Sequence, residues 1–287
     1  MLSSGELRCL TLAAQLESPQ RRLKIALLDF GDSKNALHVT DVLATRLQSP
    51  ELEVIDRDLS RAAARGYGYR GSLNLSVSEA RDLGAAIGCD FYLLGDSQTL
   101  RRSPSTGSAY FESYASIFLV SARTGKLIDW QRPSFQAAGP EQAEQKLISF
   151  LQSDDPQLYV GAIRKAYEAE RQEREQAIER NTPVIEEASE ETNDSHGTRN
   201  PRPYRRLKPA YPDSAAAADA TGTVDVVADL DEQGEVTHVD IARWAGFGMD
   251  EAALATVKQM HFFPAMRDGA VIPIRVLLRY NFRRPAK

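Results

Sequence analysis

The chain has 287 residues, of which 42% are hydrophobic and 26% are charged, and its formal net charge is −5. A chain of this size and composition is typical of a globular protein with about two domains. The acidic balance argues against a nucleic-acid-binding protein, because such binding depends on a basic surface. The two cysteines, Cys9 and Cys89, allow at most one disulfide, so cysteine usage leaves the compartment open.

Residues 1–21 are predicted to form an N-terminal tail. The apolar patch within them is short and is preceded by Glu6, so it does not resemble a signal peptide. No stretch of the chain approaches the roughly 18 apolar residues of a membrane span. We therefore expect a cytoplasmic protein, a true start upstream of Met1, or a signal peptide that is missing from this form of the chain.

Residues 22–153 have the pattern of an α/β domain with a mixed sheet. Short apolar runs predict buried strands, and apolar positions at helical spacing predict helices between them. Asp32-Ser33 can cap the first helix, Ser76 and Glu79 form a capping-box pattern for the next, and Gly88 suits its end. The expected elements are strands at 23–29, 52–56, 91–95, 109–121 and 127–135, and helices at 36–47, 76–87 and 141–151.

Three segments of this region resemble the small α/β domains of TolB N-terminal-like and CsgG-like proteins. They are Ile25-Ala26-Leu27-Leu28-Asp29-Phe30, Val54-Ile55-Asp56-Arg57 and Ile87-Gly88-Cys89-Asp90-Phe91-Tyr92-Leu93-Leu94-Gly95. The resemblance covers about Leu23 to Leu151 and consists mostly of core strands with their turns. It implies a domain of the bacterial cell envelope.

Residues 154–205 are predicted to connect two domains. Asp154-Asp155-Pro156 is a typical helix start, and a helix is expected over 154–182. The stretch 168–194 contains ten acidic and three basic residues, which cannot bury much apolar surface. We therefore expect an acidic helical tether followed by a disordered linker at 183–205.

Residues 206–287 are predicted to form a small β-β-α-β domain of two layers. Strands are expected at 222–229 and 236–242, joined by a hairpin turn that ends in Gly234. Asp250 is expected to cap the helix that follows, and Phe262 and Phe263 to anchor its end to the sheet. The final strand alternates without a break, with one face formed by Ile272, Ile274, Val276, Leu278, Tyr280 and Phe282.

The ordered set of motifs in this domain resembles the C-terminal domain of the TonB family. The motifs are Pro209-Ala210-Tyr211-Pro212, Met249-Asp250-Glu251-Ala252-Ala253-Leu254, Phe262-Phe263-Pro264-Ala265, Asp268-Gly269 and the alternating strand that ends at Phe282. TonB-type domains add a short extended peptide of an outer-membrane transporter to a sheet edge. The resemblance implies that role for the strand at 272–282.

The residues expected to bind the partner lie on this last strand: Ile274, Arg275, Leu277, Arg279 and Asn281. The last five residues printed, Arg283-Arg284-Pro285-Ala286-Lys287, include a proline and three cationic side chains. They are therefore unsuited to covering the edge with another strand. Arg275 and Arg279 are expected to attract an acidic peptide, and Leu277 to give it an apolar contact. An open edge also permits a homodimer.

Motifs that suggest chemistry have simpler structural explanations. Asp29-Phe30-Gly31 lacks the other protein-kinase motifs, and Gly66-Tyr67-Gly68-Tyr69-Arg70-Gly71 lacks the preceding strand of a dinucleotide site. None of the four histidines has a partner at metal-ligand spacing. We predict a non-enzyme with no catalytic residues, no cofactor and no metal site.

The predicted function is that of a cell-envelope adaptor in the periplasm that binds an outer-membrane or periplasmic protein through an extended peptide. The chain departs from TonB in having an α/β domain in place of a membrane helix and a Pro-rich spacer. One alternative is an energy-transducing transport component whose anchor is missing or supplied by another subunit, with inner-membrane motor proteins as partners. A second alternative is a small-ligand sensor, with the loop at 66–71 over a pocket of the α/β domain.

Overall fold

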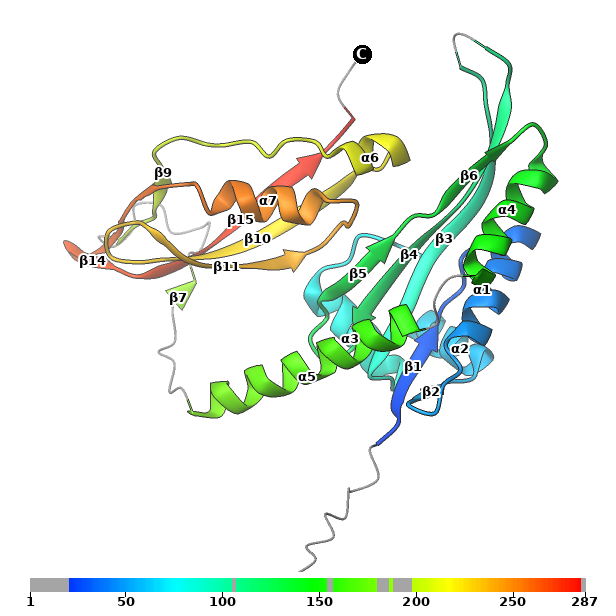
Figure 1. Cartoon of the computed structure of the whole chain (residues 1–287). Coiled ribbons are helices and arrows are strands. Elements are labelled where there is room, and N and C mark those ends of the chain that lie inside the picture. The colour runs from blue at the N-terminus through cyan, green and yellow to red at the C-terminus, as the bar shows by residue number, and fades with distance from the viewer. Residues whose placement is uncertain (1–20, 105–106, 154–156, 180–185, 188–197, 285–287) are drawn as a thin grey trace, which may run out of the picture.

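The computed structural model describes residues 21–104, 107–153, 157–179, 186–187 and 198–284 (Figure 1). The predicted tail, apart from Arg21, lies outside the described residues, as does most of the predicted linker. Within the described residues a mixed α/β sheet domain is followed by a long helix and a smaller, β-rich domain. This is the predicted fold class.

The N-terminal domain is built on a mixed sheet in the order β2-β1-β3-β4-β5, with β6 also paired to β4. The pairs β1–β2 and β1–β3 are parallel, and β4 is antiparallel to β3, β5 and β6. Its elements are β1 (Leu23–Leu27), α1 (Lys34–Arg46), β2 (Leu52–Val54), α2 (Arg57–Tyr67), α3 (Val77–Ile87), β3 (Phe91–Arg102), β4 (Tyr110–Ser121), β5 (Leu127–Gln131), β6 (Ser134–Ala137) and α4 (Pro140–Ser153).

Several local signals in this domain act as the sequence predicts. Ser33 caps α1 by accepting a hydrogen bond from the backbone of Ala36. Ser76 and Glu79 form both bonds of the capping box, and Gly88 ends α3 in the left-handed conformation. The strand predicted at 91–95 is longer, because β3 continues to Arg102 beside β4. The single strand predicted at 127–135 is divided into β5 and β6. The break includes Pro133, which has no N–H group to donate to the sheet.

The two faces of the N-terminal sheet belong to two different hydrophobic cores. Ile25 and Leu27 of β1 pack in the core that includes α1 and α4. Ala26 and Leu28, which point the opposite way, pack in the core that includes α2 and α3. The second core continues into the C-terminal domain.

The C-terminal domain has a sheet in the order β11-β10-β15-β7, with helix α7 on one face. There are two shorter sheets among the described residues. One pairs β12 with β9, and the other has the strand order β14-β13-β8. The elements from the connecting helix onward are α5 (Gln157–Glu179), β7 (Glu186–Glu187), β8 (Thr198–Arg199), β9 (Arg202–Pro203), α6 (Asp213–Ala218), β10 (Gly222–Leu230), β11 (Val236–Arg243), α7 (Met249–Val257), β12 (Phe262–Phe263), β13 (Ala265–Arg267), β14 (Ala270–Ile272) and β15 (Ile274–Phe282). The described part of the predicted linker thus contains three short strands, β7, β8 and β9, each of which pairs with a strand of this domain.

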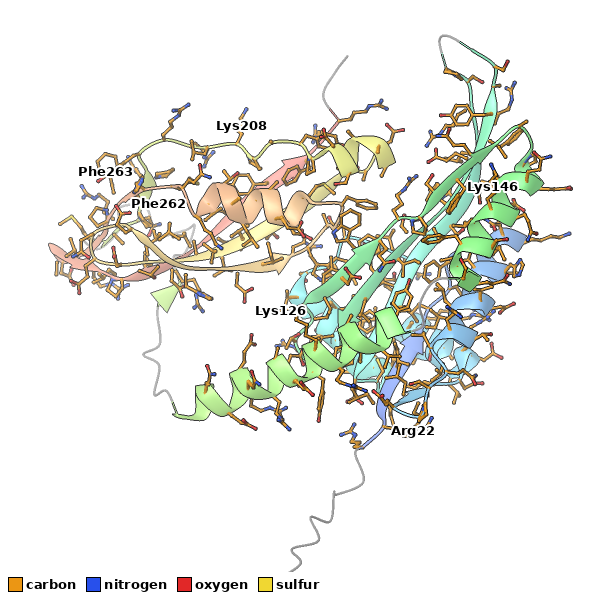
Figure 2. The ribbon with its side chains drawn as sticks, viewed as in Figure 1. Arg22, Lys126, Lys146, Lys208, Phe262 and Phe263 are labelled. Carbon is orange, nitrogen blue, oxygen red and sulfur yellow. The ribbon has the colours of Figure 1, made fainter. Side chains whose placement is uncertain are left out.

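Two residues of this domain act differently from the sequence prediction. Asp250 does not cap α7, which begins after Gly248; its buried carboxylate instead accepts hydrogen bonds from the backbone of Ala245 and Gly246 at 2.8 and 2.9 Å. Phe262 is buried as expected, but Phe263 is 54% exposed and packs edge-on against Tyr204 (Figure 2). The strand pair β9–β12 turns successive side chains to opposite faces, so only one phenylalanine reaches the core.

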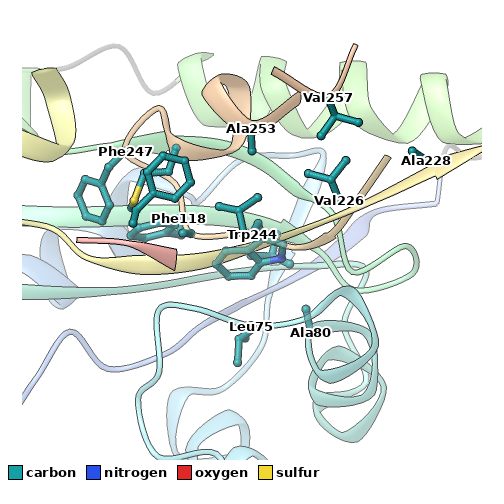
Figure 3. Packing of buried hydrophobic residues seen from close by; sticks show 14 of the residues in the cluster. Leu75, Ala80, Phe118, Val226, Ala228, Trp244, Phe247, Ala253 and Val257 are labelled. Carbon is teal, nitrogen blue, oxygen red and sulfur yellow. The ribbon is translucent and has the colours of Figure 1, made fainter. Parts of the chain in front are cut away.

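The two domains contact each other directly through aromatic side chains. Trp244, which is 1% exposed, stacks on Phe118 of β4 at 6.0 Å between ring centroids (Figure 3). Phe247 packs against both Phe118 and Trp130, at 5.5 and 5.4 Å. The loop between β11 and α7 is therefore inserted into the N-terminal domain, and the domains share one core.

Glycines allow this close approach. Gly246 has φ of +70°, and a Cβ atom there would lie 2.5 Å from the ring of Phe118. The indole Nε1 of Trp244 donates to the backbone oxygen of Gly125 at 3.0 Å. Gly125 occupies the turn between β4 and β5 with φ of +72°, where a Cβ atom would lie 2.0 Å from the backbone oxygen of Val77. A larger residue at Gly246 would push the domains apart, whereas one at Gly125 would push α3 away from the turn that Trp244 contacts.

Candidate functional site

The predicted binding strand, β15, pairs with β10 along its whole length. On its other side, β7 pairs in parallel with Ile274 and Arg275. From Val276 to Phe282, no strand among the described residues occupies that side of β15. This part of the edge therefore presents backbone groups to which a further strand could be added.

The five predicted binding residues occupy different environments. Ile274 is buried in the core at 2% exposure, whereas Leu277 is 56% exposed. Asn281 is also exposed and accepts a hydrogen bond from the hydroxyl of Thr223 at 2.8 Å. Arg275 and Arg279 lie on the same face as Leu277, because alternate residues of a strand share a face. The structure thus places one of the five, Ile274, in the core of the domain.

Arg275 and Arg279 each form a two-pronged ion pair with a buried aspartate of β10. Arg275 contacts Asp229 through Nε and Nη2 at 2.6 and 2.9 Å. Arg279 contacts Asp225 in the same way at 2.7 and 3.0 Å. The two carboxylates are each 5% exposed, so the guanidinium groups compensate buried charge as well as facing solvent.

Sequence reasoning missed these two aspartates, although a signal was present. The pairs Asp225/Asp229 and Arg275/Arg279 have the same spacing on two strands of one sheet. The antiparallel register places Asp225 opposite Arg279 and Asp229 opposite Arg275. Opposite charges directly across a sheet stabilise it, so matched spacing of this kind indicates pairing.

A groove of about 790 Å³ follows the open part of the edge. One wall is β15 from Leu277 onward, and the other is the extended segment 206–211, which runs beside it (Figures 1 and 2). Met260 lies in the lining of the groove, and Tyr280 donates a hydrogen bond to its sulfur at 3.4 Å. The charged residues among the lining are all basic: Arg206, Lys208, Arg279 and Arg283.

The segment 206–211 lines the groove opposite β15, and no strand pairing joins the two among the described residues. Its Tyr211 donates hydrogen bonds from the hydroxyl group to the backbone oxygens of Ala215 and Ala220. Burial raises the pKa of the Tyr211 and Tyr280 phenols, so both remain protonated donors. Pro209 has no N–H group and cannot contribute fully to a strand ladder. The groove between this segment and β15, called the slot below, is thus formed by the domain itself.

A second cavity, of about 730 Å³, lies in the N-terminal domain at the carboxyl end of β1. In the sheet, β2 lies on one side of β1 and β3 lies on the other, so the chain changes direction across the sheet at β1. Ligands of open α/β sheets bind at such switch points. Arg61 beside this cavity forms a two-pronged pair with Asp29 at 2.6 and 2.9 Å. The predicted loop contributes Tyr69, Arg70 and Gly71 to the lining.

The geometry of the C-terminal domain agrees with a comparison of the sequence with protein families. Residues 208–283 match the model of the Gram-negative bacterial TonB protein C-terminal domain. This segment of the chain is a TonB-type domain. The family is one of protein-interaction modules, which supports a protein partner for the chain. A search of curated proteins found no match to the chain.

A comparison with solved structures found matches of low sequence identity, each of which covers less than half of this chain. The TonB C-terminal domain of Pseudomonas aeruginosa is 20% identical, with a TM-score of 0.27, and the match covers 33% of this chain and 94% of that one. The hypothetical protein CT253 of Chlamydia trachomatis is 10% identical, with a TM-score of 0.32, and the match covers 45% and 93%. Lipoprotein GNA1162 of Neisseria meningitidis is 14% identical, with a TM-score of 0.31, and the match covers 44% and 93%.

None of the helices described is long and apolar enough to cross a membrane. Among the same residues, no group of three or more histidine, cysteine or acidic side chains is arranged to hold a metal ion.

Proposed function

We propose that the chain is a periplasmic adaptor that captures an extended, acidic peptide of another envelope protein in the slot between β15 and the segment 206–211. The observation that carries this proposal is the edge of β15 from Val276 to Phe282, beside which no strand of the described residues lies and along which a groove has only basic charged lining residues. Backbone hydrogen bonds would provide affinity, and side chains along the slot would provide the preference for acidic sequences.

The neighbouring strand β7 supports this mode of binding. It is a segment of the chain itself that pairs with β15 at Ile274 and Arg275, on the same side as the open edge. The edge therefore accepts an added strand at one end already. A partner peptide that continues this pairing would lie along Val276 to Phe282, a length of about 24 Å at 3.4 Å per residue.

The expected affinity follows from the number of backbone groups. About six ladder hydrogen bonds at about 1 kcal/mol net each would contribute about 6 kcal/mol. Ordering the peptide offsets much of this gain. Micromolar binding, about −8 kcal/mol, therefore also requires side-chain contacts, which we assign to Leu277, Met260 and the basic residues of the slot.

The test uses the full chain and a fluorescent peptide of alternating glutamate and valine, hereafter the acidic peptide. We expect the wild-type chain to bind it at micromolar concentration and to bind the matching lysine–valine peptide at least tenfold more weakly. Leu277→Pro should abolish capture, because proline disturbs the edge. Its melting temperature should be measured alongside, since a proline in β15 can also weaken the domain.

Lys208→Glu tests the slot without altering the strand. It should weaken binding of the acidic peptide by roughly three- to tenfold, because it places a like charge on the wall. Lys165→Glu is the matched control, since it makes the same charge change at an exposed site on α5, outside the groove lining. Equal effects of the two substitutions, or equal binding of the two peptides, would refute the proposal.

A small-ligand sensor is a second candidate, favoured by one observation. The loop that the sequence singled out contributes Tyr69, Arg70 and Gly71 to the cavity at the carboxyl end of β1. A screen of small phosphorylated and carboxylated compounds against the full chain would test it. A rise in melting temperature that disappears in Arg70→Ala would support a sensor, and a screen without any shift would count against it.

A further inference from the structure

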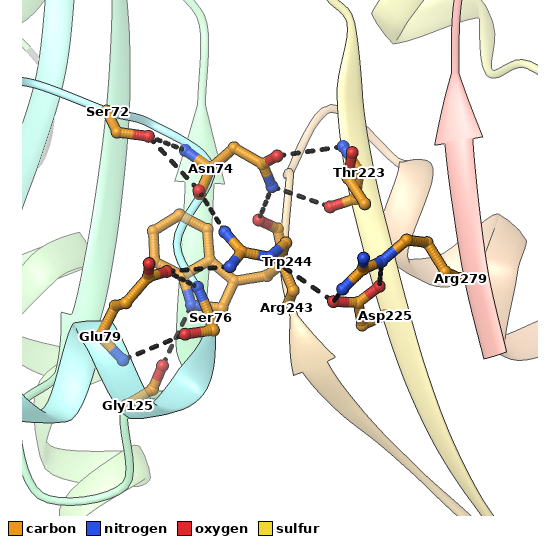
Figure 4. A network of polar contacts seen from close by, with 10 residues as sticks. All are labelled: Ser72, Asn74, Ser76, Glu79, Gly125, Thr223, Asp225, Arg243, Trp244 and Arg279. Atoms are coloured by element: carbon orange, nitrogen blue, oxygen red, sulfur yellow. Dashed lines mark hydrogen bonds and ion pairs between the residues drawn. The ribbon is translucent and has the colours of Figure 1, made fainter. Parts of the chain in front are cut away.

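A chain of polar contacts runs from helix α3 of the N-terminal domain to β15 of the TonB-type domain (Figure 4). Arg243, at the end of β11, is its centre. One nitrogen of its guanidinium group lies 3.1 Å from Glu79 of α3, and another donates to the backbone oxygen of Asn74 at 2.9 Å. Its Nε lies 3.5 Å from Asp225, the aspartate that also holds Arg279.

The buried carboxylate of Asp225 is thus shared between Arg243 and Arg279, and the Arg279 side chain is 59% exposed. The side chain of Asp225 is 7% exposed and that of Arg243 is 24% exposed. Arg279 forms two short contacts with the carboxylate, whereas the contact of Arg243 is longer. Charges interact more strongly in such surroundings than in water. A change in the position of Arg243 therefore alters how firmly Asp225 holds Arg279.

Glu79 is the second carboxylate that contacts Arg243, through a different nitrogen of the guanidinium group. Its carboxylate also accepts a hydrogen bond from the backbone of Ser76 at 2.8 Å as part of the capping box. That hydrogen bond, together with Arg243, lowers the pKa of Glu79, so the carboxylate stays ionised near neutral pH. The position of Glu79 is set by α3, and hence by the way the N-terminal domain is docked.

The network lies at the boundary between the domains. Next to Arg243, Asn74 donates to the backbone oxygens of Thr223 and Trp244 and accepts from the N–H group of Thr223. Thr223 and Asp225 belong to β10, the strand that pairs with β15. The N-terminal domain therefore contacts the backbone of β10 directly and reaches the side chain of Asp225 through Arg243.

We propose that Arg243 is a positioning residue for the peptide slot, and that its division between Glu79 and Asp225 sets the availability of Arg279 to an acidic peptide. The N-terminal domain thereby tunes the affinity of the TonB-type domain for its partner. This inference rests on the proposed function, because it concerns how the same slot is regulated.

The arrangement gives opposite expectations for two substitutions. Glu79→Gln removes the competing charge, so Arg243 moves toward Asp225 and Arg279 is released to the peptide. Glutamine preserves the capping box, so α3 keeps its start. Arg243→Gln removes one of the two arginines that contact Asp225 among the described residues, so Asp225 holds Arg279 more firmly. We expect roughly two- to fivefold tighter binding for the first variant and roughly two- to fivefold weaker binding for the second.

The experiment measures the dissociation constant of the acidic peptide for the full chain by fluorescence anisotropy, with each substitution made alone and together with Arg279→Gln. A double-mutant cycle separates an effect that passes through Arg279 from a general change in the electrostatic field. We expect both shifts to disappear in the Arg279→Gln background. Melting temperatures of all variants identify any loss of folded protein.

Three results would contradict the proposed role of Arg243. Shifts that persist in the Arg279→Gln background would show a general field effect and overturn the positioning role. Shifts of the same sign for Glu79→Gln and Arg243→Gln would also overturn it, while leaving peptide capture intact. A wild-type chain that does not bind the acidic peptide at all would refute the proposed function, and this inference with it.

Discussion

The contact between the domains makes a strong prediction about how the chain unfolds. Trp244 is 1% exposed and its Nε1 donates to the backbone oxygen of Gly125. Truncation of a buried tryptophan to alanine costs about 3–5 kcal/mol, and the lost hydrogen bond adds about 1 kcal/mol. Domains of this size are stable by only about 5–15 kcal/mol. We therefore expect Trp244→Ala to separate the domains before either of them unfolds.

Intrinsic fluorescence is a direct assay, because the chain has 2 tryptophans and both Trp130 and Trp244 lie at this contact. In urea, the wild-type chain should unfold in one transition that coincides by fluorescence and by far-ultraviolet circular dichroism. Trp244→Ala should show two transitions. The first should be reported by Trp130, which loses its contact with Phe247.

A control variant distinguishes loss of the contact from loss of stability. Leu43 is 1% exposed and belongs to the other hydrophobic core of the N-terminal domain. Leu43→Ala should cost about 2–5 kcal/mol and still give one transition at a lower urea concentration. If Trp244→Ala also gives one transition, with a midpoint close to that of the wild-type chain, the shared core does not couple the domains and the reasoning fails.

Two further predictions concern the loop that joins β11 to α7. Burial raises the pKa of Asp250 to about 6, although two backbone N–H groups oppose the shift. Because the folded-state pKa lies above the unfolded one, this carboxyl group makes unfolding free energy fall as pH rises from about 4 to about 6, by up to about 3 kcal/mol. The difference in urea stability between the wild-type chain and Asp250→Asn, measured across this range, should fall accordingly; a difference that does not change with pH would contradict the assignment. Gly246→Ala should destabilise the chain by about 2 kcal/mol more than Gly269→Ala. Both glycines have positive φ, but a Cβ atom at Gly269 would meet nothing within 4 Å, whereas one at Gly246 would overlap Phe118. Equal shifts in melting temperature would show that the domains separate freely at this point.

Helix starts and ends were predicted correctly from the sequence where a few neighbouring residues determine them. Ser33, the capping box of Ser76 and Glu79, and the helix end at Gly88 all behave as predicted, because their hydrogen bonds span only three to five residues. The alternation of the last strand correctly gave the face that packs inward, including Val276 and Phe282. The prediction for Phe263 was wrong because its neighbour Tyr204 comes from a segment far earlier in the chain. The prediction for Asp250 was wrong because its carboxylate turns to the preceding loop, where it bonds to the backbone of Ala245 and Gly246.

The binding edge was predictable only in part. The residues of β15 and the motifs around it were sufficient to identify a TonB-type domain, since strand periodicity and turn residues are encoded locally. The partners of its arginines depend on the register between β10 and β15, and the second wall of the slot comes from a segment about 70 residues earlier in the chain. The docking of the N-terminal domain depends on Trp244 and Phe247 meeting rings of β4 and β5, more than a hundred residues away in sequence. Sequence by itself therefore determined the elements, the inward faces and the family of the C-terminal domain. Which charges are already paired, what lines the slot and how the two domains join were decided only by the tertiary structure, because those properties arise from contacts between distant segments.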